Sequence, residues 1–237
     1  MIDLNKKYWI ILGGFALLTI GGLLFTLRRK KAVGSNSKSS KSANTSSSFK
    51  TKLVDLANSE WDKWNKGGVR IKEGSQDTLQ DLRDYWEKGA GVKQNDKYYI
   101  GEAWSSAFIS YLMRTTGAGD DFKYSSSHSQ YIAQAVKNRK ENNAKKFKAY
   151  KPNEVDVQVG DLVCYPRQSG VTYDSGAGYK SHCDLIVSVS VDNAVGIGGN
   201  VSDSVSKKNY ALKDGKIDKS KDSKAYGGIF TVIKNEK

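Results

Sequence analysis

Hydrophobic residues recur at helical spacing through the first half of the chain and give way to short β-branched runs in the second half. An unbroken run of twenty uncharged, mostly apolar residues, 8–27, comes first. As a helix, a run of this length would match a hydrocarbon core about 30 Å thick. Four cations at 28–31 follow directly, which favours a retained anchor over a cleaved signal peptide. We therefore predict a single-pass transmembrane anchor with a basic flank over residues 1–31.

The next segment, 32–48, consists almost entirely of Ser, Asn, Lys, Gly, Ala and Thr. Such a composition buries too little apolar surface to fold, so we predict a flexible linker. The remaining residues, 49–237, contain enough aromatic and aliphatic side chains for one packed domain.

Within this domain the apolar period changes from helical to alternating near Gly160. Four helices are predicted, over 49–65, from about Leu79 to Gly89, from Trp104 to Gly117, and over about 127–138. Five strands are predicted, over 161–165, 183–189, 194–197, 210–212 and 228–233. Helices followed by strands indicate an α+β fold in which the helices pack on one face of an antiparallel sheet.

Four short segments in a fixed order carry the candidate chemistry: 103–111 (AWSSAFISY), 160–165 (GDLVCY), 181–187 (SHCDLIV) and 197–200 (IGGN). This order resembles that of papain-like cell-wall amidohydrolases of the NlpC and CHAP type, in which a nucleophile opens a helix and a histidine begins a strand. The first and third segments are also similar to a bacterial and phage domain family of unknown function. The resemblance covers roughly residues 53–237 and implies a papain-like (NlpC/CHAP-like) fold.

The resemblance also implies roles for individual residues. Ser105 stands where those enzymes have their cysteine nucleophile, His182 matches the general base, and Asn200 matches the polar residue that orients the imidazole. Trp104, Ser106, His128 and Asp184 are expected to contact substrate. A hydroxyl needs its proton removed during attack, unlike a thiol that ionises beside a histidine, so an inactive binding domain is the alternative.

Each of these residues also has an ordinary structural interpretation. A serine at a helix start commonly caps the free N–H groups there, and this applies to Ser105 and Ser106. His182 could be a strand-edge histidine bonded to backbone, and a Gly-Gly-Asn sequence such as the one ending at Asn200 is a common turn.

The two cysteines are expected to be buried core residues. Strand alternation should turn Cys183 away from the face of His182, and Cys164 lies in an apolar run. A disulfide between them is one alternative if the domain lies outside the cytoplasm. The loop around 173–179 is expected to overhang the site near His182.

The charge of the chain is concentrated beside the predicted anchor. Residues 1–52 hold ten Lys or Arg against one Asp, a net +9 of the total +13. This favours contact with the headgroups of a lipid bilayer over nucleic acid, for which no base-reading motif is present. We predict no cofactor and no metal, because the two histidines lack a paired ligand spacing and no phosphate loop occurs.

Taken together, these features predict a membrane-anchored hydrolase of amide bonds, most plausibly in the stem peptides of peptidoglycan. The alternatives are an inactive adaptor that binds wall peptide or a protein, and a phage structural or injected protein. The basic flank at 28–31 favours a cytoplasmic domain, whereas a wall substrate requires an extracytoplasmic one, and the sequence leaves both orientations open.

Overall fold

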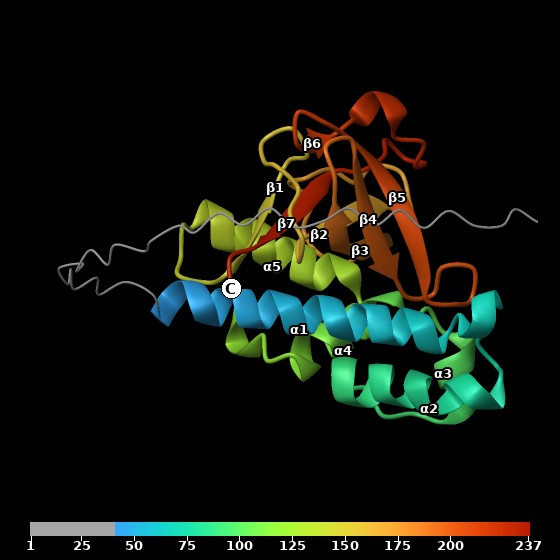
Figure 1. Cartoon of the computed structure of the whole chain (residues 1–237). Coiled ribbons are helices and arrows are strands. Elements are labelled where there is room, and N and C mark those ends of the chain that lie inside the picture. Colours follow the sequence, from blue (N-terminus) through green and yellow to red (C-terminus); the bar gives the residue numbers. More distant parts are fainter. Residues whose placement is uncertain (1–40) are drawn as a thin grey trace, which may run out of the picture. The chain divides into compact units, whose positions relative to one another are not determined.

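The structure, a computed structural model, describes residues 41–237, and the predicted transmembrane segment lies outside this part of the chain. Among the described residues there is no helix with the length and apolarity needed to span a bilayer. The helices lie together on one side of the described region and a curled sheet lies on the other, with loops above it (Figure 1).

Helices make up most of the first hundred described residues. The first helix begins at Lys41, inside the segment predicted to be a linker, and a six-residue helix after Asn95 is too short to show a helical period in the sequence. The helices are α1 (Lys41–Lys63), α2 (Gln76–Asp84), the π-helix η2 (Tyr85–Ala90), α3 (Asp96–Gly101), α4 (Ser105–Thr115) and α5 (His128–Lys140), with 3-10 turns η1 (Lys66–Gly68), η3 (Gly119–Asp121) and η4 (Lys219–Lys221).

The helix α4 is the centre of the helical layer, and most of its residues are buried. It packs closely on η2, where a Cβ at Gly89 would lie 2.6 Å from the carbonyl oxygen of Ala107. The absence of a side chain at Gly89 therefore lets the two backbones touch. This contact fixes α4, and with it the position of its first residue, Ser105.

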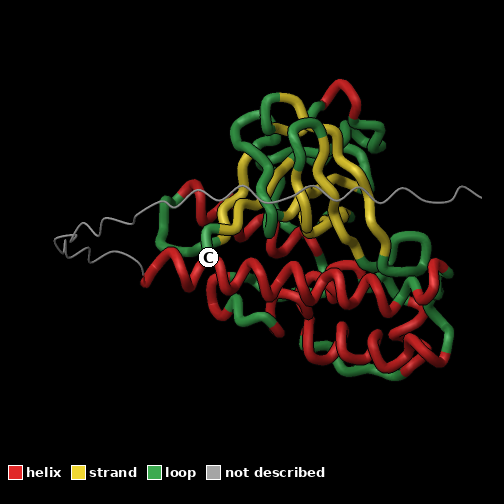
Figure 2. The backbone as a smooth tube through the Cα atoms, viewed as in Figure 1, coloured by secondary structure: helices red, strands yellow, loops and turns green. Residues whose placement is uncertain are grey.

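The strands, yellow in Figure 2, form one antiparallel sheet. Their order in the sheet is β1-β7-β2-β3-β4-β5-β6. Five of its strands coincide with predicted ones, whereas β1 and β6 were not anticipated. The strands are β1 (Phe147–Tyr150), β2 (Leu162–Pro166), β3 (Ser181–Val189), β4 (Asn193–Gly198), β5 (Ser206–Lys213), β6 (Lys216–Ile217) and β7 (Thr231–Asn235).

Alternation along the central strands divides the apolar residues between two cores. Cys164 and Leu185 belong to the large core under the helices, whereas Val163 and Ile186 belong to a smaller core on the opposite face. The second face is covered by loops and the carboxyl-terminal turns, because residues such as Ile217 pack there. The predicted α+β class, with helices on one face of an antiparallel sheet, is confirmed.

The two cysteines form a disulfide across neighbouring strands. Cys164 of β2 is directly opposite Cys183 of β3, with Cα atoms 4.1 Å apart, and both are fully buried. Both side chains lie in the core under the helices, on the face away from His182, as strand alternation predicts. The disulfide joins the two strands next to the loop of residues 167–180 that connects them.

Candidate active site

The start of α4 meets the start of α5 at a serine–histidine pair. Ser105 is the first residue of α4 and His128 is the first residue of α5. The hydroxyl oxygen of Ser105 lies 2.7 Å from Nε2 of His128. This is the expected separation for a serine hydroxyl bonded to a general base.

Ser105 does not act as the helix cap. Trp104 occupies the capping position of α4, and no side chain caps this end. The backbone N–H groups of Ser105, Ser106 and Ala107 have no hydrogen-bond acceptor among residues 41–237. The hydroxyl of Ser105 therefore lies beside three unused donors, at the positive end of the helix dipole.

Both ring nitrogens of His128 have hydroxyl partners. Nδ1 bonds to the Tyr131 hydroxyl, and Nε2 bonds to the Ser105 hydroxyl. The neighbouring Ser106 hydroxyl donates to the backbone carbonyl of Ser125 at 2.9 Å. When Nδ1 donates to the Tyr131 oxygen, Nε2 presents a lone pair to the Ser105 hydroxyl, which is the tautomer a general base requires.

The surroundings keep His128 uncharged. Burial lowers its pKa well below the usual value, and the neighbouring His182 lowers that pKa further. Burial also raises the pKa of the Tyr131 hydroxyl, which stays protonated. At neutral pH the pair is thus a neutral hydroxyl facing a neutral imidazole.

His182 lies beside this pair, in a separate polar network. Its ring centroid is 5.2 Å from that of His128. Nε2 of His182 is 2.9 Å from the Asp184 carboxylate, and Nδ1 is 3.3 Å from the Arg167 guanidinium. Burial lowers the pKa of His182, so a neutral ring donates from Nε2 to Asp184 and accepts at Nδ1 from Arg167.

The carboxylate of Asp184 is the fully buried centre of this network. Burial by itself raises the pKa of Asp184, but His182 and Lys208 lower it more, and the net pKa is below the ordinary value. The Lys208 ammonium lies 2.9 Å from the carboxylate, and the Tyr210 hydroxyl also donates to it. Asp184 is therefore ionised and balanced by Lys208.

Gly198, the last residue of β4, and Gly199, which follows it, make room for both parts of the site. A Cβ at Gly198 would lie 1.7 Å from Oδ1 of Asp184, and one at Gly199 would lie 2.6 Å from Phe108 of α4. The sequence analysis interpreted Gly-Gly as part of a turn, whereas its role in the structure is close packing.

The hydrogen-bond partner of Ser105 differs from the one expected from the sequence. Ser105 bonds to His128, whereas both ring nitrogens of His182 have other partners. Asn200 follows β4 in a left-handed backbone conformation with φ of 52°. No hydrogen bond joins its side chain to His182 in the described region, where Nε2 of His182 is instead bonded to Asp184.

Three of the four predicted substrate contacts are buried structural residues. Trp104 packs against Trp64 and Tyr85 in the core, with ring centroids 5.0 Å and 5.6 Å from its own. Ser106 and Asp184 are at most 1% exposed and bonded as described above. The fourth, His128, contacts Ser105 as the candidate base. The sequence pattern did not show that the side chains of Trp104, Ser106 and Asp184 are buried.

The loop of residues 167–180 lies over the start of α5. The backbone N–H of Gly178 donates to the Ser129 hydroxyl at 3.0 Å, next to His128. The contact lies where the sequence predicts an overhanging loop. Ser105 and His128 are 8% and 4% exposed.

Tyr131 and Lys208 are the important residues that the sequence analysis missed. Tyr131 is three residues after His128 on a helix, a spacing that places two side chains on one face and could have indicated the pair. No local spacing could have indicated Lys208, because it is brought opposite Gly196 by the pairing of β4 with β5. In residues 41–237 no group of three His, Cys, Asp or Glu side chains is arranged to hold a metal ion.

Comparison with known proteins gives one match. The sequence model of a family described as "Uncharacterized protein conserved in bacteria (DUF2272)" matches residues 62–226, which is more than half of the chain. No curated protein and no solved structure matches the chain.

Proposed function

The chain belongs to this family of bacterial proteins, and we propose that it hydrolyses amide bonds in peptides, with Ser105 as nucleophile and His128 as general base. The observation that carries the proposal is the 2.7 Å contact between the Ser105 hydroxyl and Nε2 of His128. The resemblance to papain-like wall amidohydrolases supports peptidoglycan stem peptides as the substrate, held by a papain-like domain.

The proposed reaction begins at the contact between the Ser105 hydroxyl and Nε2 of His128. The Ser105 oxygen attacks the amide carbonyl carbon while its proton passes to Nε2 of His128. The unused N–H groups at the start of α4 stabilise the negative oxygen of the tetrahedral intermediate. His128 then gives the proton to the leaving amine, and the C–N bond breaks to leave an ester on Ser105. A water molecule, deprotonated by His128, hydrolyses that ester and releases the acid.

The environment of His128 predicts a slow enzyme. Protonation of the ring is opposed by burial and by His182, and Tyr131 offers it a neutral oxygen in place of a carboxylate. The Asp184 charge is the group that favours the imidazolium. This is a weaker arrangement than a triad in which a carboxylate bonds directly to the imidazole.

The disulfide supports placing the domain outside the cytoplasm. Disulfides persist in oxidising compartments and are rare in the reducing cytosol, and the Cys164–Cys183 bond is fully buried in the core. An extracytoplasmic domain tethered by the predicted anchor would reach the wall. On this placement the cytoplasmic orientation favoured by the basic flank at 28–31 would be incorrect.

The test is cleavage of purified peptidoglycan by the full chain, followed by mass spectrometry of the released fragments. Wild type should release new amino and carboxyl ends, whereas Ser105→Ala and His128→Ala should each release none. Ser126→Ala is the matched control, because Ser126 is exposed on the segment that leads to His128. This variant should cleave peptidoglycan as wild type does. Absence of cleavage by wild type over a broad panel of walls and peptides would reject the proposal.

An inactive peptide-binding domain is the second candidate, and the low exposure of Ser105 and His128 favours it. On this hypothesis wall peptide should bind to wild type and to Ser105→Ala equally well, with no turnover by either.

A further inference from the structure

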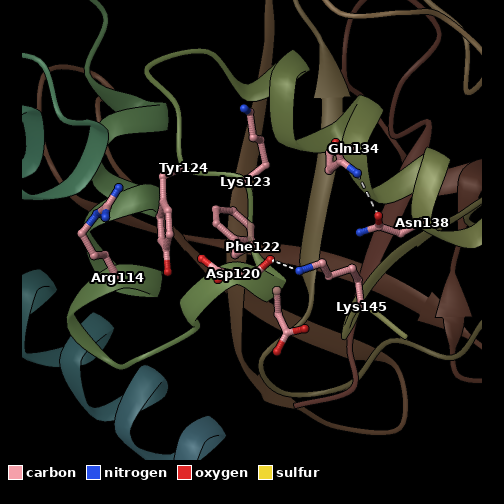
Figure 3. A pocket seen from close by; sticks show the side chains of 9 residues that line it. Arg114, Asp120, Phe122, Lys123, Tyr124, Gln134, Asn138 and Lys145 are labelled. Carbon is pink, nitrogen blue, oxygen red and sulfur yellow. Dashed lines mark hydrogen bonds between the residues drawn. The ribbon is translucent and has the colours of Figure 1, made fainter. Parts of the chain in front are cut away.

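A cavity of about 430 Å³ lies between α4, α5 and the segment that joins them, and neither Ser105 nor His128 lines it (Figure 3). Arg114 of α4, Lys123 and Tyr124 of the joining segment, Gln134 of α5 and Lys145 contribute to its lining. The volume is within the usual range of small-ligand sites, about 300–1,000 Å³.

The guanidinium of Arg114 is held in place before any ligand binds. Its Nε donates to the carbonyl of Gly89 at 3.2 Å, and its central carbon lies 3.9 Å from the centre of the Tyr124 ring. The Tyr124 hydroxyl in turn donates to the carbonyl of Gly119 at 2.9 Å. The terminal nitrogens of Arg114 have no acceptor in the described part of the chain, so a planar pair of donors is left free.

Positive charge in this cavity is not balanced by its carboxylates. Arg114, Lys123 and Lys145 form no ion pair with any residue in 41–237, and Lys145 donates to the backbone carbonyl of Asp120. Of the two lining carboxylates, that of Asp121 is already paired with a lysine at 3.1 Å. Three cations therefore face the single unpaired carboxylate of Asp120.

The opposite wall offers a hydrogen-bond acceptor. The Asn138 amide nitrogen donates to the carbonyl of Phe147 at 2.9 Å, which fixes its oxygen as an acceptor. Gln134 must then donate to that oxygen, at 2.9 Å, and its own carbonyl oxygen has no donor among the described residues. The oxygen is free to accept an N–H group from a ligand.

We propose that this cavity binds the terminal carboxylate of a peptide, with the carboxylate on Arg114 and a backbone N–H of the peptide on Gln134. The planar donors of Arg114 match the two oxygens of a carboxylate, and Lys123 and Lys145 add attraction. A phosphate polymer would satisfy the cations but has no N–H for Gln134. The site stands independently of the proposed hydrolysis, because Ser105 and His128 do not line the cavity.

The experiment is calorimetric titration of the full chain carrying Ser105→Ala, which prevents turnover and so separates this test from the proposed activity. The probes are N-acetyl-trialanine, its carboxyl-terminal amide and glycerol phosphate. The free acid should bind at least about tenfold more tightly than the amide, since one charge-assisted contact is lost. Arg114→Gln should weaken binding of the free acid by about the same factor.

Two further variants keep the result interpretable. Arg83→Gln is the matched control, because Arg83 does not line the cavity and is already paired with Asp96, and this variant should bind as the parent does. Lys123→Gln tests the cavity without disturbing the Arg114–Gly89 contact and should also weaken binding. The proposal is overturned if the free acid and the amide bind equally or not at all, if Arg83→Gln loses as much affinity as Arg114→Gln, or if glycerol phosphate binds more tightly than the peptide.

Discussion

Replacing Gly198 by alanine tests the buried network around Asp184, because the new methyl group has no space. An ideal Cβ at this position would lie 1.7 Å from Oδ1 of Asp184 and 2.9 Å from Nε2 of His182. The carboxylate is fully buried and bonded to His182 and Lys208, so it has no solvent to move into. The new methyl group must therefore displace either strand β4 or the carboxylate of Asp184.

The cost can be estimated from these two routes. Inserting a methyl group into a packed core costs about 1–3 kcal/mol. Separating a buried charge from its partner costs about 3–5 kcal/mol. We therefore expect Gly198→Ala to lower the free energy of unfolding by about 3 kcal/mol or more, which is a large part of the roughly 5–15 kcal/mol that stabilises a typical domain.

The assay is guanidinium denaturation of the full chain in detergent, followed by tryptophan fluorescence. Gly176→Ala is the control, because a Cβ at Gly176 meets no heavy atom within 4 Å and its φ is not positive. This control should stay within about 0.5 kcal/mol of wild type. If Gly198→Ala unfolds at the same denaturant concentration as Gly176→Ala, the packing described around Asp184 is incorrect.

Three further predictions concern the same region. Burial lowers the pKa of His128 and His182 in the folded protein, so below the ordinary histidine pKa of about 6.5 the unfolded chain binds more protons than the folded one. The melting temperature should therefore fall from pH 7 towards pH 5, and it should fall less in His128→Gln. Removing the disulfide by replacing both Cys164 and Cys183 with alanine should lower the free energy of unfolding by about 3 kcal/mol, given the 19-residue separation of the cysteines. A reductant should cause the same loss in wild type, and an unchanged denaturation midpoint with both thiols free would contradict this. Tyr131→Phe should slow peptide cleavage by about tenfold or more, because Nδ1 of His128 loses its hydrogen-bond partner. An unchanged rate would reject this role for Tyr131.

The sequence was sufficient for the fold class because its apolar periods are strong. The alternation near Cys164 and Cys183 correctly assigned both side chains to the core, and the helical period before Gly117 located α4 with its serine at the start. The short α3 and β1 were missed because each is too brief for a period to develop. The papain-like relationship remains a proposal based on resemblance.

The site was predicted less well, because its partners depend on tertiary contacts. Ser105 was identified from its position at a helix start, but the choice between His128 and His182 depends on which ring each loop brings within bonding distance. The pairing of the strands brings Lys208 next to Asp184, and no local sequence pattern predicts that ion pair. Asn200 matched a motif by order alone, and the Asp184 side chain two residues after His182 supplies the contact instead.

In the proposed mechanism Nε2 of His128 activates the Ser105 hydroxyl, and a fluorophosphonate probe tests this activation without knowledge of the substrate. Such a probe forms a covalent phosphonate ester with an activated serine and releases fluoride. Peptide mapping should find the label on Ser105 in wild type and none in His128→Ala, with labelling retained in the exposed-serine variant Ser126→Ala. Absence of label on wild-type Ser105, or undiminished labelling in His128→Ala, would contradict the account.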